Sequence, residues 1–479
     1  MKKYLFIVFF LVTLCVKGKS QTFNLSEEVN INRAEMYGVI GKVNDRTLFF
    51  YVEDGYITIK AFDEKMNRVG EKKIEPEKRH SVKVFDVLAG KSDFCVLYEY
   101  RKHGRYYFKI EKYDASLRLL DSMSIAGARV GLMDEFSTTM VHSEDRRAVA
   151  FYAILGSENL EATSVDLDSM RMIQSKKYSV KGIDLKEDFK EALVSNKGDI
   201  FLAFENHNEI GRIQKHSVSV MAYSVEGGEA QYNVPIKEYI STGMKFAFDN
   251  LHNQLVACGL YTKKGGFKTQ GYFTAYINAS PNPTIGFHPF DDEFMSSIKG
   301  RKVSKNKGLA DVKIQEIAFR KDGGIMLFVE QVEERSRAVN SYSYTGAYIQ
   351  SGGRPLLAQK DYYYDNIFVF SIHPNGEQHW RTVLYKKQYS QNDDAAFCSF
   401  FLMRNSGALR LIFNDEVQRR TTVSEYVVNG AGQYEHHAIL NTEGQNVYLR
   451  FHDSVQTGSN EIVAPSEDKH RVRLLKVVY

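Results

Sequence analysis

Cysteine is scarce in this chain, with four residues among 479. Cys15 follows Leu14, where a lipoprotein signal would carry a small residue, so lipidation is a minor alternative. Cys95, Cys258 and Cys398 lie more than a hundred residues apart, each in an apolar run. Their odd number and wide spacing argue against a disulfide framework or a zinc site. We expect three buried thiols that pack as small hydrophobic side chains.

The sequence also lacks a hydrophobic run long enough to cross a membrane as a helix, which takes about 20 apolar residues. The apolar stretch Tyr4–Val16 is shorter; it follows two lysines and precedes small residues at Gly18 and Ser20. This order is typical of a secretory signal rather than a membrane anchor. We predict a signal peptide over residues 1–20, cleaved before Gln21, and an exported protein located in the periplasm or at the outer membrane.

Excess charge of either sign is missing once this segment is removed. The whole sequence carries a formal charge of +4. Residues 1–20 contain four lysines and no acidic residue, so the remaining chain is formally neutral. A bulk electrostatic attraction to nucleic acid or acidic lipid therefore has no support, and we expect no nucleic-acid partner.

Motifs of catalysis and nucleotide binding are absent as well. The sequence contains neither a Gly-x-Ser-x-Gly nucleophile elbow nor His-Glu-x-x-His. Gly265–Thr269 imitates a phosphate-binding loop, but its glycines are too close together and it lies where a hairpin turn belongs. The boxes that mark sialidase propellers and Trp-Asp-repeat blades are also missing. We predict no catalytic residue, no metal site and no cofactor, and binding is favoured over catalysis, which stays open.

What the sequence does contain is a repeat. A segment of alternating apolar and polar residues ends in an Asp, Asn, Gly or Pro turn about every 50 to 56 residues, a period typical of propellers. A more apolar strand pair precedes each hairpin, such as Ile314–Phe319 with Ile325–Val329. Four strands with an apolar inner pair make one propeller blade. The eight signals begin at Tyr56, Tyr106, Ala162, Ser217, Tyr272, Asn366, Thr421 and Arg471.

The count of signals predicts an all-β chain whose residues 21–479 form a single β-propeller of eight blades. Seven blades are the alternative if the first unit is degenerate, and a parallel β-solenoid is a second, with normally shorter repeats. The eighth signal, Arg471–Val478, has no partner strand after it. Because Phe23, Leu25 and Val29 alternate near the other end, we expect this N-terminal segment to complete the last blade. Closure of the ring removes exposed sheet edges.

Three inserts break the period. Residues 291–309 connect blades five and six through a short amphipathic turn, residues 332–362 lie between the second and third strands of blade six, and residues 385–396 connect blades six and seven. These kinds of connection emerge on one face of a propeller, and binding residues concentrate on such loops. The alternative is that the inserts cap the central channel. The rim residues that we predict to bind are Tyr342, Tyr344, Tyr348, Arg354, Tyr389, Asp393 and Asp394.

Asp393 and Asp394 are adjacent carboxylates. Such groups can ligate Ca²⁺, or one of them can form an acid–base pair with a second rim carboxylate such as Asp365. Neighbours in sequence point in different directions, so the pair alone specifies no geometry. A solvated turn leading into Phe397 is the favoured interpretation.

The chain from residue 21 onward resembles the exported β-propeller proteins of Bacteroidetes-type bacteria. The resemblance lies in Ser20–Gln21 at the end of the signal, the unit Phe248–Gly259, the run Trp380–Glu416, and Pro465–Glu467 before the last strand. It implies the propeller fold and an envelope location, and it brings no catalytic residues.

Three hypotheses of function follow. The first is a non-catalytic binding or scaffold protein of the cell envelope that holds a protein or glycan partner at one rim. The second is a carbohydrate-active enzyme, a glycoside hydrolase or lyase, with rim carboxylates. The third is a structural component of a larger envelope complex. The sequence leaves the oligomeric state open.

Overall fold

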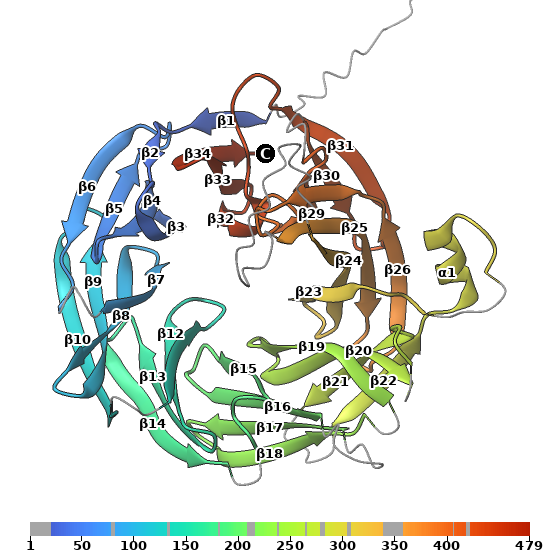
Figure 1. Ribbon diagram of the computed structural model, residues 1–479, viewed down its shortest axis with the longest axis horizontal. Coiled ribbons are helices and arrows are strands. Elements are labelled where there is room, and N and C mark those ends of the chain that lie inside the picture. Colours follow the sequence, from blue (N-terminus) through green and yellow to red (C-terminus); the bar gives the residue numbers. More distant parts are fainter. Residues whose placement is uncertain are drawn as a thin grey trace, which may run out of the picture.

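The computed structural model describes residues 21–77, 82–131, 135–180, 183–207, 216–236, 239–263, 266–277, 283–303, 308–338, 358–405, 407–417 and 422–479. Its strands form eight antiparallel sheets that follow one another around a ring (Figure 1). The chain is therefore an eight-bladed β-propeller, which confirms the predicted fold class and blade number. The predicted signal segment, residues 1–20, lies outside the described residues.

The first four blades each contain four strands, numbered from the channel outward. Blade one is β3 (Ala34–Val43), β4 (Arg46–Glu53), β5 (Tyr56–Phe62) and β6 (Arg68–Ile74). Blade two is β7 (Val82–Ala89), β8 (Asp93–Lys102), β9 (Arg105–Asp114) and β10 (Leu119–Arg129). Blade three is β11 (Phe136–His142), β12 (Ala148–Leu155), β13 (Asn159–Asp166) and β14 (Arg171–Ser179). Blade four is β15 (Phe189–Val194), β16 (Ile200–His207), β17 (His216–Ser224) and β18 (Gly228–Val234).

The other four blades include the exceptions to this plan. Blade five is β19 (Tyr239–Asp249), β20 (Gln254–Lys263), β21 (Gly271–Ile277) and β22 (Thr284–Pro289). Blade six is β23 (Val312–Phe319), β24 (Ile325–Ala338), β25 (Ala358–Ile372) and β26 (Gln378–Leu384), with β27 (Gln388–Gln391) added. Blade seven is β28 (Phe401–Arg404), β29 (Leu409–Asn414), β30 (Thr422–Val428) and β31 (Tyr434–Asn441). Blade eight is β32 (Val455–Gly458), β33 (Glu461–Asp468) and β34 (Arg471–Val478), completed by β1 (Thr22–Leu25) and β2 (Val29–Asn30).

The hydrophobic core lies between neighbouring blades. One cluster joins Phe50 of blade one to Phe94 and Tyr98 of blade two, and another joins Leu260 of blade five to Phe370 of blade six. The second strands are covered on both faces by such clusters, which is why sequences such as Ala148–Leu155 are almost continuously apolar, whereas third strands such as β9 alternate in sequence and in burial. The fourth strands face solvent on one side and alternate as well.

The ring is closed by the N-terminal segment, as predicted. β1 pairs with β34 in the register Thr22 to Val478, and Figure 1 shows the first and last strands side by side. The backbone N–H of Ser26 donates to Leu474 O (3.0 Å), and its hydroxyl accepts from Leu474 N (2.9 Å). Val29 and Ile31 are buried beside this seam. Blade eight thus contains both ends of the described chain.

The recurring hairpin signal has one physical basis. Asp63, Asp114 and Asn429 end third strands, and each side chain accepts hydrogen bonds from the backbone N–H groups two and four residues later. A short polar side chain at this position thereby fixes the turn to the fourth strand. The Asp and Asn residues that mark the turns in the sequence are the residues that make these hydrogen bonds.

A glycine pair in two equivalent turns yields a stability prediction. Gly432, in the turn from β30 to β31, has φ +80°, and a Cβ there would lie 2.6 Å from the ring of Trp380. Gly376, in the same turn of blade six, has φ +84° and open space around it. Both alanine variants suffer the left-handed backbone, about 1–2 kcal/mol. Gly432→Ala should lower the free energy of unfolding in urea by about 1–3 kcal/mol more, because only it meets the indole. Equal losses would contradict the packing argument.

The inserts differ in part from expectation. Residues 291–309 contain the helix α1 (Asp292–Lys299), which buries Phe294 and Met295 and lies on the outer side of the ring beside β26 in Figure 1. Interpreting all of 332–362 as a loop was wrong for its two ends, since β24 and β25 stay paired as far as Ala338 and Ala358. The Ser, Tyr and Gly residues of the middle dominated that interpretation, although charged and aromatic residues at the ends suit a hairpin.

The three cysteines of the described chain are buried thiols, as expected. Cys95, Cys258 and Cys398 are buried and free. Burial raises the pKa of the Cys95 thiol to about 12 and that of Cys398 to about 11. A short 3₁₀ helix, η2 (Phe451–Asp453), precedes blade eight. In the described part of the chain, no helix has the length and apolar character needed to span a membrane.

Candidate functional site

Blade six carries an extension that ring formation does not require. β24 and β25 span 14 and 15 residues, and they continue to pair beyond Val332, where β24 leaves its other neighbour, β23. β27 pairs with β25 from Asp361 to Tyr364 and adds a third strand. We call this three-stranded extension, residues 332–338, 358–364 and 388–391, the blade-six arm.

A buried carboxylate ties the three strands of the arm together. The side chain of Asp361, on β25, is 1% exposed and forms an ion pair with Arg337 of β24. Its Oδ1 also accepts hydrogen bonds from the Tyr389 hydroxyl (2.7 Å) and Gln391 Nε2 (2.8 Å), both on β27. The Arg337 guanidinium holds the pKa of this carboxyl well below its usual range. Asp361 is therefore charged across ordinary pH and holds the arm as one unit.

The predicted rim residues divide into two groups. Tyr389 lies on the arm, half-buried, with its ring 5.0 Å from that of Tyr363. Asp393 Oδ1 accepts a hydrogen bond from Ala395 N (3.1 Å). Asp393 therefore lies in a turn, which was the favoured interpretation of the Asp393–Asp394 pair. Asp394 is exposed, and one of its oxygens accepts from the Tyr362 hydroxyl (3.0 Å). The other four predicted residues lie outside the described part: Tyr342, Tyr344, Tyr348 and Arg354.

A fully buried ion pair lies at the base of the arm. Lys386 Nζ is 2.6 Å from Glu330 Oε1, and both side chains are 0% exposed. Glu330 Oε2 also accepts from Ser399 Oγ and Gln315 Nε2, each at 2.7 Å. Lys386 Nζ donates further to Gln388 Oε1 (2.8 Å). Because Gln388 begins β27 and Ser399 precedes blade seven, this network anchors the arm to the junction of two blades.

The carboxylates considered for catalysis have different surroundings. Burial raises the pKa of Asp365, on β25. Asp393 is committed to its turn. Among the described residues, no three His, Cys, Asp or Glu side chains gather in a way that could hold a metal ion.

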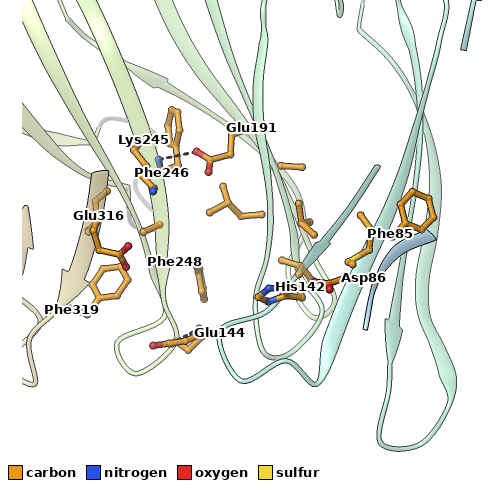
Figure 2. Close-up of a pocket in the computed structure, with 18 of the residues that line it drawn as sticks. Phe85, Asp86, His142, Glu144, Glu191, Lys245, Phe246, Phe248, Glu316 and Phe319 are labelled. Atoms are coloured by element: carbon orange, nitrogen blue, oxygen red, sulfur yellow. Dashed lines mark hydrogen bonds between the residues drawn. The ribbon is translucent and has the colours of Figure 1, made fainter. Parts of the chain in front are cut away.

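The channel contains a second candidate site. A cavity of about 550 Å³ is lined by the innermost strands of blades two to seven. Figure 2 shows Asp86 and His142 close together on one side and Glu191 near Lys245 on another, with Phe85 beside Asp86 and Phe248 on a neighbouring strand. None of these residues is among those predicted to bind.

Apart from Tyr389, the residues that build the two sites were not predicted from the sequence, although one signal was available. The run Ile325–Val332 is apolar except for Glu330 and Gln331, and of these two only Glu330 carries a charge. An acid at such a position must find a buried partner, and Lys386 is the partner. Asp86 and Glu191 gave no such signal, because each follows a shift in strand pairing that alternation alone does not reveal.

Comparison with known proteins gives distant structural neighbours only. No family model matches this chain, and no curated protein matches it. The β-propeller domain of Nup133 from Vanderwaltozyma polyspora is 9% identical, with 97% of this chain and 99% of that chain covered and a TM-score of 0.42. The polysaccharide lyase Uly1 is 10% identical, with 95% and 99% covered and a TM-score of 0.38. Dihydro-heme d1 dehydrogenase NirN is 10% identical, with 93% and 75% covered and a TM-score of 0.40.

Proposed function

We propose that this chain is a non-catalytic binding or scaffold protein of the cell envelope, which uses the blade-six arm to hold a protein or glycan partner. The observation that carries the proposal is that two ion pairs with buried carboxylates hold the blade-six arm in place. Asp361 and the Glu330–Lys386 pair stiffen an extension in which β24 has continued beyond its pairing with β23. A binding residue on a rigid support loses little entropy when it engages a partner. The exported location rests on residues 1–20 and on the family resemblance.

The arm offers side chains suited to such a contact. Glu334 and Arg335 are exposed on β24, and the Arg335 guanidinium lies 5.1 Å from the centre of the half-buried Tyr363 ring. Arginine and tyrosine are the residues that most often dominate interface energies. The carbohydrate-active alternative draws its support from Asp365, whose raised pKa suits a proton donor.

Affinity capture from the native envelope fraction tests this function. We expect the tagged protein to retain a stoichiometric partner, and the double variant Arg335→Ala/Tyr363→Ala to retain at least about tenfold less. Tyr434→Ala, an exposed tyrosine on β31 of blade seven, is the matched control and should retain as much as the parent protein. Equal capture by the arm variant, or no partner from any variant, would overturn the proposal. Hydrolysis or lyase activity on envelope glycans, lost in Asp365→Asn, would favour the enzyme instead.

A further inference from the structure

Three blades present acids at one level of the channel. On β7, β15 and β23 the pairing with the next strand shifts at a bulge, and an acid follows each shift: Asp86, Glu191 and Glu316. Each acid stands three residues before the end of its strand. A bulge redirects the side chain that follows it. Blades two, four and six, alternating around the ring, thereby aim carboxylates into the same cavity.

Two of these carboxylates form no ion pair with another described residue. Glu316 forms an ion pair with Arg404 (2.5 Å). By contrast, Asp86 Oδ1 accepts from the N–H of Val87 (2.7 Å), and Glu191 Oε2 accepts from the N–H of Phe246 (3.0 Å). Burial raises the pKa of both Asp86 and Glu191. The folded cavity therefore disfavours their charge, and a bound cation would reverse that.

The bases near these acids are engaged elsewhere. Lys245 Nζ donates to the carbonyl of Gln315 (2.7 Å). Arg146, near Asp86, donates to the carbonyl of Ile40 (3.2 Å), and Nδ1 of His142 lies 2.8 Å from the carbonyl oxygen of Ser143. Carboxylates outnumber lysine and arginine four to two in the cavity lining. Acidic side chains thus predominate in the lining, although Lys245 competes with a ligand for Glu191.

Aromatic rings line the same cavity as the two acids. Phe85, Phe248 and Phe319 are half-buried and line the same cavity. Its volume of about 550 Å³ falls within the usual range for small-molecule sites, about 300–1,000 Å³. Aromatic faces attract ammonium groups, and they also pack against methylene chains.

We propose that the channel cavity is a binding site for a small aliphatic diamine or polyamine. Asp86 and Glu191, on blades separated by one other blade, each receive one ammonium group, and the methylene chain between them lies against Phe248. The two separated acids favour a ligand with two charges over one with a single charge. This site is independent of the blade-six arm and of any partner there.

Isothermal titration calorimetry on the chain from residue 21 tests the site, with spermidine and putrescine as probes. Butylamine, with one ammonium, and butanediol, with none, are the comparators. We expect both polyamines to bind more tightly than butylamine, and butanediol not to bind. Asp86→Asn and Glu191→Gln should each weaken spermidine binding by about tenfold or more. Glu435→Gln, an exposed acid on β31, is the control and should leave the affinity unchanged.

Lys245→Met provides a test whose expected result, a higher affinity for spermidine, cannot be produced by misfolding. Removing this competing cation should strengthen spermidine binding several-fold, the opposite of what a damaged fold would give. The proposal is overturned if butanediol binds as well as putrescine, if spermidine fails to bind at millimolar concentration, or if the Asp86, Glu191 and Lys245 variants all retain the parent affinity.

Discussion

Lys386→Met is expected to lower the free energy of unfolding by about 3–5 kcal/mol, because it leaves the carboxylate of Glu330 buried without its cation. Both side chains are inaccessible to solvent. Two neutral donors, Ser399 Oγ and Gln315 Nε2, would remain on Glu330, but hydrogen bonds from neutral groups do not replace a full opposite charge. Urea denaturation followed by circular dichroism measures the loss.

Two further variants separate this effect from a general loss of packing. Lys387 is the next residue and is exposed, so Lys387→Met should change stability by no more than about 0.5 kcal/mol. In the double variant Lys386→Met/Glu330→Gln no unpaired charge is buried, and more than half of the lost stability should return. If Lys386→Met costs no more than Lys387→Met, the ion pair does not support the arm.

Removal of residues 21–31 should open the ring and cost about 3–6 kcal/mol from Val29 and Ile31 alone, at about 1.5–3 kcal/mol for each buried side chain. Both residues are buried against Val472 and Leu474 of β34. The deletion also removes the backbone pairing of β1 and leaves β34 as an exposed edge, which promotes association of separate molecules. Urea denaturation and light scattering of the chain beginning at residue 32 measure these two effects.

The deleted segment itself provides the control. A synthetic peptide of residues 21–31, added in trans, should restore stability in proportion to the logarithm of its concentration once it exceeds the dissociation constant. A peptide with Val29→Asp should not, because it would bury an unpaired charge. Unchanged stability after the deletion would mean that the last blade holds the ring without its N-terminal strand.

The fold was predictable because each blade repeats a local rule. Asp63, Asp114 and Asn429 fix their turns through contacts within four residues, so the sequence carries the information in short windows. Ring closure was predictable by elimination, since Arg471–Val478 needed a partner and only the N-terminal segment was unassigned. Local rules and a count were sufficient for both.

The candidate sites depend on contacts that short windows do not contain. Arg337 meets Asp361 and Lys386 meets Glu330 across 24 and 56 positions in the chain, so neither partner can be read from its neighbours. Asp86 and Glu191 follow bulges, and a bulge inserts one residue that changes which face the following side chains occupy, at a position that the sequence pattern does not mark. The four predicted rim residues between 342 and 354 stay predictions.

The three buried thiols give this ring a set of internal reporters. Cys95 lies on β8, Cys258 on β20 and Cys398 next to β28, which places one in each of blades two, five and seven. A thiol reacts as its thiolate. Because burial disfavours the thiolate and excludes the reagent, each cysteine should react with an alkylating reagent only when its own blade opens. Equal rates of alkylation would mean that the ring opens as one unit, and three different rates would rank the sectors by local stability. Native cysteines can therefore measure the local opening of three blades separately, without an engineered probe.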